Sequence, residues 1–346
     1  MGVLKRYGAL LPITDKTPKV NLEEGSTPLV RLDRIGDELG IELWGKLEGC
    51  NPSGSFKDRG MVLAVAKALE DGARALVCAS TGNTSASAAA YAAHVGIPCY
   101  VLHPAGKVAM GKLAQSLIYG AKVVAIDGNF DRALDMARTA ADERDFAMVN
   151  SVNPYRLISQ KTGAWEICES LGTAPDIHII PVGNACNISA YWAGYKDFHE
   201  QGRIKSLPRM IGIQAEGAAP LVTGRPCPNP ETVATAIRIG NPVGADKAKN
   251  AVAESGGAFA SVTDEEILKA QSLLASKGGV FAEPASCATL AGLINMKKAG
   301  KLPEGSRVVM ILTGNGLKDP DTALSQVEEP VRIGDTITEL LGVLES

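Results

Sequence analysis

Short apolar segments alternate with longer segments of helical periodicity through most of the chain. Apolar runs rich in β-branched residues predict strands at residues 74–80, 98–102, 122–126, 146–150, 177–182, 210–214 and 307–312. Helical spacing predicts helices at residues 56–69, 84–96, 108–119, 130–144 and 188–198. Strands that are apolar throughout are buried on both faces, which is typical of parallel sheets covered by helices. The pattern therefore predicts an α/β fold, and a length of 346 residues favours about two domains.

The stretch NPSGSFKDRG, residues 51–60, puts Lys57 in the first turn of a predicted helix. A helix N-terminus carries partial positive charge and disfavours a second cation. A neutral lysine amine is nucleophilic and forms an imine with an aldehyde, so Lys57 is the leading candidate for chemistry. Taken alone, the pattern is more often that of a solvated surface lysine, here paired with Asp58.

Two other strand-to-helix turns are rich in small and polar residues. The turn STGNT, residues 80–84, would offer amides, hydroxyls and a helix N-terminus to a carboxylate. The turn GNACN, residues 183–187, would let successive backbone N–H groups converge on a phosphate. GNACN matches neither the Walker pattern nor GxGxxG, which argues against nucleoside triphosphates and dinucleotides. Helix capping by Ser80, Thr81 or Asn83 remains an alternative for the first turn.

Two further places combine polar groups with the end of a predicted strand. In LTGNG the hydroxyl of Thr313 is placed to pair with a neutral ring nitrogen, or to cap the turn. In VNSVNPYRL the side chains of Asn150, Ser151 and Arg156 suit a phosphate dianion, for which arginine offers forked donors. A solvated loop would have the same composition.

Together, an amine that can form an imine, a phosphate cradle and a partner for a ring nitrogen are what pyridoxal phosphate requires. The ordered motifs NPSGSFKDRG, STGNTSASAAAYAA, GNACNI and LTGNG resemble those of the β-family, or fold type II, of pyridoxal-phosphate enzymes. Within that family, NPSGSFKDRGM, VNSVNPYRL and LTGNGLKDP are most similar to the motifs of threonine synthases. The resemblance runs from about Thr27 to Asp319.

The resemblance implies a role for each matching residue. Lys57 would hold the cofactor as an imine and then move protons at the substrate carbons, Asn83 would contact the pyridine 3-hydroxyl, and Thr313 would face the pyridine nitrogen. The other implied contacts are with the cofactor phosphate, from Gly183, Asn184, Ala185, Cys186 and Asn187, with the substrate carboxylate, from Ser80, Thr81 and Thr84, and with a substrate phosphate, from Lys112, Asn150, Ser151 and Arg156.

The resemblance also implies an architecture and an activity. The fold would be two open, twisted, mostly parallel sheets flanked by helices, with a small mobile domain at 51–150 and a large cofactor-binding domain at 1–50 and 151–346. The implied reaction is that of a lyase that converts O-phospho-L-homoserine and water to L-threonine and phosphate, by γ-elimination and β-replacement, in a cytoplasmic homodimer. Two alternatives stay open: a threonine or serine dehydratase with the same cofactor, and a non-catalytic α/β protein that binds a ligand.

One residue departs from the family pattern. Enzymes of this type usually have glycine where Cys186 stands, because glycine tolerates positive φ and the close approach of an oxyanion. If the loop keeps its conformation, Cys186 must adopt a backbone angle without strain. Its thiol would lie near a phosphate and a helix N-terminus, a position that lowers a cysteine pKa.

Composition narrows the range of partners. The net charge of −3, without a basic block, argues against nucleic acid, and the longest apolar runs are too short to span a bilayer. The first residues are soon interrupted by Pro12, Asp15 and Lys16, unlike a secretory signal. The seven cysteines are scattered and form no CxxC pair, which suggests neither a zinc site nor a disulfide framework.

Two segments fall outside the α/β alternation. Residues 223–244 are rich in proline and glycine, and we interpret them as a surface excursion because strand and helix patterns resume afterwards. From about Val327 a charged stretch gives way to a short helical pattern, which predicts a terminal arm or a dimer contact.

Overall fold

The computed structural model describes residues 1–105 and 110–345, and the side chains of all of these except residues 110–112 and 130. The strands are β1 Leu29–Arg31, β2 Glu42–Leu47, β3 Ala75–Ala79, β4 Cys99–Pro104, β5 Lys122–Ile126, β6 Phe146–Met148, β7 Ile177–Pro181, β8 Arg209–Ala215, β9 Ala258–Val262 and β10 Arg307–Leu312. The helices are α1 Val3–Tyr7, α2 Asp33–Leu39, α3 Lys57–Glu70, α4 Asn83–Val95, α5 Met110–Ile118, α6 Phe130–Glu143, α7 Pro154–Gln160, α8 Thr162–Leu171, α9 Cys186–Glu200, α10 Pro220–Thr223, α11 Ala245–Glu254, α12 Asp264–Gly278, α13 Pro284–Lys298, α14 Pro320–Leu324 and α15 Ile337–Leu344. Short 3₁₀ turns are η1 Gly8–Leu10, η2 Glu48–Cys50, η3 Glu216–Ala218, η4 Thr235–Ile237 and η5 Gly316–Lys318.

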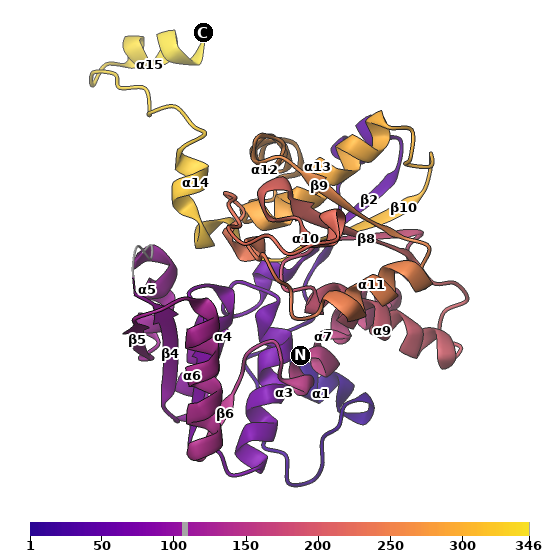
Figure 1. Cartoon of the computed structure of the whole chain (residues 1–346). Coiled ribbons are helices and arrows are strands. Elements are labelled where there is room, and N and C mark those ends of the chain that lie inside the picture. Colours follow the sequence, from indigo (N-terminus) through magenta and orange to yellow (C-terminus); the bar gives the residue numbers. More distant parts are fainter. Residues whose placement is uncertain (106–109, 346) are drawn as a thin grey trace.

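The strands form two separate sheets (Figure 1). One has the order β5-β4-β3-β6 and is parallel throughout, and the other has the order β1-β2-β10-β7-β8-β9 and is parallel except for β1. Helices cover both sheets, because strands such as β3 and β7 are buried along their whole length and need cover on each face. The predicted architecture of two open, mostly parallel sheets flanked by helices is confirmed.

All seven predicted strands are present, and three strands were not predicted. The apolar runs at 122–126 and 307–312 match β5 and β10 residue for residue. The sequence prediction missed β1, β2 and β9, because β1 is only three residues long, β2 contains a glycine and a lysine, and β9 is made largely of small residues. The predicted helix at 108–119 is α5, except that residues 108 and 109 lie outside the described residues.

The sheets bring together turns that are distant in sequence. β3 ends at Ala79, just before the turn at 80–84, and β7 ends at Pro181, just before the turn at 183–187. β10 pairs with β7 in parallel and ends at Leu312, next to Thr313. Ligands of open α/β sheets bind outside the carboxyl ends of the strands, and the turns identified from sequence occupy that position.

Helix α3 is anchored by a cluster of buried charges, which we call the charge cluster: Lys46, Glu48, Arg59 and Glu166. The Arg59 guanidinium donates to Glu48 Oε2 at 2.7 Å and to Glu166 Oε2 at 2.7 Å. The Lys46 amine also donates to Glu166 Oε2, at 2.7 Å. All four side chains are 2% exposed or less, so two cations and two carboxylates neutralise each other inside the protein.

The proline-rich segment is not only a surface excursion. Residues 226–243 form one wall of a large cavity, and Ala234 and Ile237 within them are buried. The backbone N–H of Val243 donates to Asn184 Oδ1 at 3.0 Å, and that of Gly244 donates to Asn184 O at 3.1 Å. Its composition correctly indicated a loop, but these contacts hold the loop against the 183–187 turn.

The C-terminal segment, residues 325–345, forms the arm that the sequence predicted as one of two possibilities. Figure 1 shows α15 standing away from both sheets. Large apolar side chains of the arm are exposed, namely Val327, Val331, Ile333, Ile337, Leu340, Leu341, Val343 and Leu344. Within residues 1–105 and 110–345, no helix has the length and apolar character needed to cross a membrane.

Candidate active site

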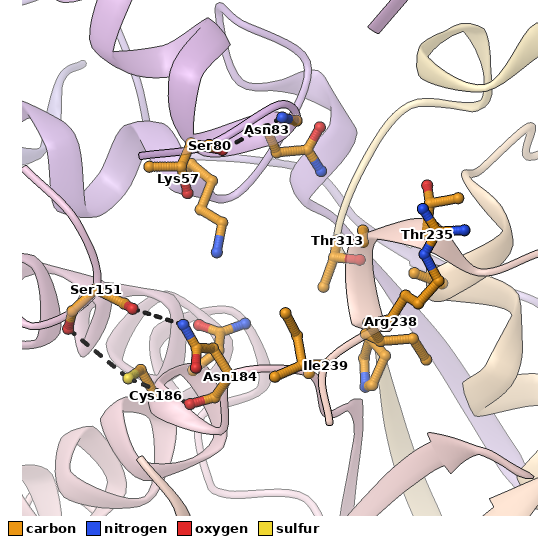
Figure 2. Close-up of a pocket in the computed structure, with 18 of the residues that line it drawn as sticks. Lys57, Ser80, Asn83, Ser151, Asn184, Cys186, Thr235, Arg238, Ile239 and Thr313 are labelled. Atoms are coloured by element: carbon orange, nitrogen blue, oxygen red, sulfur yellow. Dashed lines mark hydrogen bonds between the residues drawn. The ribbon is translucent and has the colours of Figure 1, made fainter. Parts of the chain in front are cut away.

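A cavity of about 1140 Å³ lies between the two sheets, at the carboxyl ends of their strands. Its lining includes the turns at 80–84 and 183–187, the end of β10, and the loop at 226–243. Figure 2 shows Lys57 extending into the space that Asn184, Cys186 and Thr313 border. The structure therefore brings the separate sequence motifs into one site.

Lys57 is the first residue of α3, as predicted, and its amine faces the cavity. Among the described residues the amine has neither a hydrogen-bond acceptor nor a carboxylate partner, and it lies 4.2 Å from the ring centroid of Phe56. Burial lowers the pKa of Lys57 to about 7, with a smaller lowering from Arg156, while Cys186 and Glu283 oppose the shift. A substantial share of the amine is therefore neutral, and so nucleophilic, at neutral pH.

The turn at 183–187 has the shape of an anion cradle at the N-terminus of α9. A Cβ atom on Gly183 would lie 2.9 Å from Ile237 Cα, so only glycine fits there. Ala185 caps the helix with φ of +64°, a left-handed conformation that is costly for a residue with a Cβ atom. Asn187 is 9% exposed, and both polar atoms of its amide lack partners within the described part of the chain. A buried orphan amide beside a helix N-terminus suits a phosphate.

Cys186 adopts its backbone angle without strain, but its pKa shifts in the direction opposite to the expectation. The left-handed backbone angle falls on Ala185, and Cys186 is the first residue of the helix. The thiol contacts Asn184 O at 3.5 Å and Ser151 O at 3.8 Å. Burial raises the pKa of Cys186 above its usual value, although Lys57 and Arg156 oppose the rise. The side chain is therefore a neutral thiol that donates to two carbonyl groups.

Asn83 and Thr313, the predicted ring contacts, share one partner that the sequence did not reveal. Glu283 lies at the N-cap of α13 and is 4% exposed. Its Oε1 accepts from Thr313 Oγ1 at 2.8 Å, and its Oε2 accepts from Asn83 Nδ2 at 3.0 Å. Ser286 Oγ lies 3.0 Å from Thr313 Oγ1. The nearest sequence signal is an acidic residue before a proline, which indicates only the start of a helix.

The turn at 80–84 leads into α4 and faces the cavity. Ser80, Thr81 and Thr84 all line the cavity and are partly exposed. The N-cap of α4 is Gly82, which has no side chain, so capping does not explain the polar residues of this turn. Ser80 Oγ accepts from the Gly82 backbone at 3.2 Å. The hydroxyls therefore remain candidates to bind a carboxylate.

The residues expected to bind a second phosphate converge only in part. Arg156 is 1% exposed, donates through Nη1 to Val149 O at 3.0 Å, and keeps Nε and Nη2 without partners in the described structure. Burial lowers the pKa of Arg156 to about 10. Ser151 Oγ accepts from Asn184 Nδ2 at 2.7 Å and keeps its own proton available.

Two other residues that were expected to bind the second phosphate, Asn150 and Lys112, differ from Arg156 and Ser151. The amide of Asn150 makes paired hydrogen bonds with the backbone of Ala79, at 3.0 and 2.9 Å, so only one of its N–H bonds remains for a ligand. Its main contact is with the end of β3. Lys112 belongs to α5, and its side chain lies outside the part of the chain that the structure describes.

Comparison with known proteins agrees with this geometry. Residues 20–314 match the family model described as "Pyridoxal-phosphate dependent enzyme". The threonine synthase of Halalkalibacterium halodurans is 56% identical over 327 residues, which cover 94% of this chain and 92% of the relative. That of Mycobacterium leprae is 54% identical over 347 residues, covering 99% and 96%, and that of Methanocaldococcus jannaschii is 53% identical over 350 residues, covering 98% and 86%.

Solved structures with the same fold are more distant in sequence. A maize serine racemase superposes with a TM-score of 0.77 at 20% identity, and the match covers 94% of each chain. The processed form of threonine deaminase isoform 2 from Solanum lycopersicum has a TM-score of 0.72 at 20% identity, and the match covers 93% of this chain and 83% of the deaminase. These two likenesses show the fold alone. The family match and the curated relatives show that the chain belongs to the pyridoxal-phosphate dependent enzymes and, among them, to the threonine synthases.

Proposed function

We propose that the chain converts O-phospho-L-homoserine and water to L-threonine and phosphate in the cavity that contains Lys57. The observation that carries this proposal is Arg156. A buried guanidinium with two unpartnered nitrogens, in the same cavity as a phosphate cradle, calls for a second anion. A substrate that carries its own phosphate supplies one.

The cavity also fits the cofactor of the family. The orphan amide of Asn187 and the narrow space at Gly183 suit its phosphate. Asn83 and Thr313 line the cavity and would contact its ring, and the Lys57 amine extends into the same cavity and would attack its aldehyde. When bound, pyridoxal phosphate supplies this aldehyde and a ring that accepts electrons from the substrate carbons.

Lys57 would then move the protons of the reaction. Its pKa of about 7 means that it takes a proton and returns one with similar ease at neutral pH. It would remove one proton from Cα and one from Cβ as the γ-phosphate leaves, and return one to Cγ, which becomes the methyl carbon, and one to Cα. Water would give its hydroxyl group to Cβ and its remaining proton to the departing phosphate. The turn at 80–84 would hold the substrate carboxylate, so that Cα and Cβ stay within reach of the amine.

Arg156 and Ser151 would hold the leaving phosphate. The guanidinium offers two free nitrogens and Ser151 offers a hydroxyl proton. Because the pKa of Arg156 stays near 10, the group remains a cation throughout the reaction. It would neutralise charge as the carbon–oxygen bond breaks.

A threonine or serine dehydratase needs the same cofactor but leaves Arg156 without a ligand. The deciding experiment compares two products of the purified enzyme: phosphate from O-phosphohomoserine, and ammonia from threonine or serine. We expect phosphate release to dominate by orders of magnitude in kcat/KM. Comparable ammonia release would favour the dehydratase.

We also propose that residues 51–150 close as a small domain on the remainder. This range contains every strand of the four-stranded sheet. Contacts across the cavity support a closed arrangement here: Asn83 with Glu283, and the Lys318 amine with Ser53 O at 2.8 Å. Structures with and without a substrate analogue test the movement.

A homodimer in the cytoplasm completes the proposal. Closed symmetric dimers are the commonest soluble assemblies, and the apolar residues exposed on the C-terminal arm offer a surface that a second copy would cover. Sedimentation at several protein concentrations tests the dimer. A monomer at micromolar concentration would contradict it, and fractionation of cells tests the location.

A further inference from the structure

The backbone carbonyl of Ser53, in the turn before Lys57, accepts hydrogen bonds from two side chains that are distant in sequence. Lys318 Nζ, on η5 after β10, donates to Ser53 O at 2.8 Å, and Gln115 Nε2, on α5, donates to it at 2.9 Å. Lys318 Nζ also donates to Gln115 Oε1 at 2.5 Å. The three groups form a triangle in which each contacts the other two. This triangle joins α5, from the small domain, to the segment that follows β10 in the large domain.

The turn at 51–56 has other contacts that fix its place. The backbone N–H of Phe56 donates to Thr313 O at 3.0 Å, and that of Asn315 donates to Gly54 O at 3.0 Å. These bonds tie the turn to the end of β10 on the large domain. The turn therefore lies at the hinge of the proposed small domain, and what the triangle adds is a hold on α5.

Helix α5 depends on such contacts because it is short. It spans the nine residues Met110–Ile118, and a helix of this length is marginal in water without packing. Gln115 uses both ends of its amide, since Nε2 donates to Ser53 and Oε1 accepts from Lys318. A primary amide is the side-chain group that offers a donor and an acceptor side by side, so glutamine suits this position.

We propose that Gln115 and Lys318 are positioning residues that hold α5 against the turn before Lys57 when the small domain closes. The inference rests on the proposed closure of residues 51–150, and it names the contact that secures it. Gln115 lines the cavity, so α5 borders the space in which the substrate would bind. Breaking the contact lowers the share of molecules with α5 docked, and the apparent affinity for substrate falls in proportion to that share.

A direct contact between Lys318 and a ligand is the competing explanation, because Lys318 also lines the cavity. The two explanations differ in what they predict for Gln115. Gln115→Leu removes both hydrogen bonds of α5, whereas Lys318→Met removes one and leaves the bond from Gln115 to Ser53. A positioning pair therefore gives the larger effect in Gln115→Leu, and the double variant is no worse than Gln115→Leu alone. A ligand contact gives the larger effect in Lys318→Met.

The first measurement is amide hydrogen exchange of α5 in the holoenzyme without substrate. Exchange reports the opening of this helix and needs no turnover. In Gln115→Leu we expect exchange about 3–10-fold faster, as for the loss of hydrogen bonds of ordinary strength. Lys318→Met should show a smaller increase, and Lys318→Arg, which keeps a cationic donor, should recover part of it. Lys269→Met, at a surface lysine paired with Glu265 on α12, is the matched control and should match the wild type.

The second measurement is steady-state kinetics with O-phosphohomoserine. KM should rise in Gln115→Leu by about the same 3–10-fold, because both measurements follow the undocked share of α5. Once substrate saturates the enzyme, kcat should change by less than about twofold, since the catalytic groups keep their places. A merely structural defect would instead lower kcat and cofactor affinity together.

Unchanged exchange of α5 in a folded Gln115→Leu holoenzyme overturns the proposal, whatever the activity. It is also overturned if KM rises in Lys318→Met and not in Gln115→Leu, or if the double variant multiplies the effects of the two single variants. If Gln115→Leu does not fold, unchanged exchange in Lys318→Met decides against the proposal, and if neither folds, α5 exchange in the wild type as fast as in an unstructured peptide does so. A wild type that does not consume O-phosphohomoserine contradicts the proposed function, while the exchange measurement still decides the role of the pair.

Discussion

The first turn of helix α3 carries two cations, two residues apart, in opposite electrostatic settings. Arg59 points into the charge cluster, where two carboxylates bind it. Burial alone would lower the pKa of Arg59, but Glu166 and Glu48 raise it well above its usual value. Lys57 points into the cavity without a carboxylate partner among the described residues, and burial lowers its pKa to about 7.

The contrast separates charges that hold the fold from charges that await a ligand. A buried charge is tolerated when it is paired, and the charge cluster achieves this within the chain. Among the described residues, no carboxylate pairs with Lys57 or Arg156 in the cavity, so we infer that their anionic partners come from outside the chain. Burial and charge alone would not distinguish the two regions, whereas the presence of a partner does.

The largest expected effect comes from removing the unpaired amine of Lys57 from the cavity. Lys57→Ala should lower the rate of threonine formation by at least about 10²–10⁴-fold, because the proton carrier is lost. It should also abolish the visible absorbance that borohydride removes in the wild type. Lys67→Met, on the same helix but paired with Glu70, is the control and should keep both properties. Activity in Lys57→Ala close to that of the control would contradict the assignment.

The next largest effect comes from removing a paired cation, Arg59, from the charge cluster. Arg59→Met should cost about 3–5 kcal/mol of the free energy of unfolding, because it leaves Glu48 and Glu166 buried with one cation for two carboxylates. Arg156→Met should cost far less, since it removes a charge that has no carboxylate partner. Urea unfolding of the two apoproteins measures the difference. Equal losses would show that pairing is not what separates the regions.

A smaller effect tests what Arg156 binds. Arg156→Ala should lower kcat/KM for O-phosphohomoserine by about 10–150-fold, equivalent to the ~1.5–3 kcal/mol of a hydrogen bond to a charged group. Cofactor affinity, followed by absorbance titration of the apoprotein, should change by less than about twofold. Arg156→Lys keeps the charge and should recover part of the loss. Parallel losses of cofactor and substrate would place Arg156 in the cofactor site instead.

Taken per pH unit, the smallest effect is a pH dependence of stability. The pKa of Lys57 is about 7 in the folded apoprotein and 10.5 as its ordinary value, so between these pH values the unfolded chain holds more protons. Stability should therefore rise with pH across this window, by at most about 1.4 kcal/mol per pH unit from this group. Lys57→Met should lack this contribution. The measurement is the difference in unfolding free energy between the two apoproteins from pH 7 to 9.5, and a difference that falls with pH would refute the assigned shift.

The sequence predicted the features that depend on residues close together along the chain. The apolar runs of β3, β7 and β10 predicted the sheets, the glycine-containing turn after β7 indicated the cradle, and the turn before α3 indicated the position of Lys57. The apolar pattern did not predict β2, because Lys46 interrupts it. That lysine is buried only because Glu166, 120 residues later, neutralises its charge. Such a partner has no signal within a short window of sequence.

The same limit explains the errors within the site. Glu283 accepts a hydrogen bond from Asn83, which is 200 residues away, so its neighbours in sequence say nothing about this contact. Proline and glycine marked residues 223–244 as a loop, but only Asn184 determines that the loop faces the cavity. For Cys186, the motif did not reveal that the left-handed backbone angle falls on Ala185, because the helix begins at 186.

The C-terminal arm has a practical consequence for work with the purified protein. It exposes Ile337, Leu340, Leu341 and Leu344 on a single short helix that stands apart from the sheets (Figure 1). Any part of this apolar helix that a dimer partner leaves uncovered promotes non-specific association in concentrated samples. A variant truncated after Ser325 should therefore remain in solution at higher protein concentrations without precipitating. It still contains every residue that lines the catalytic cavity.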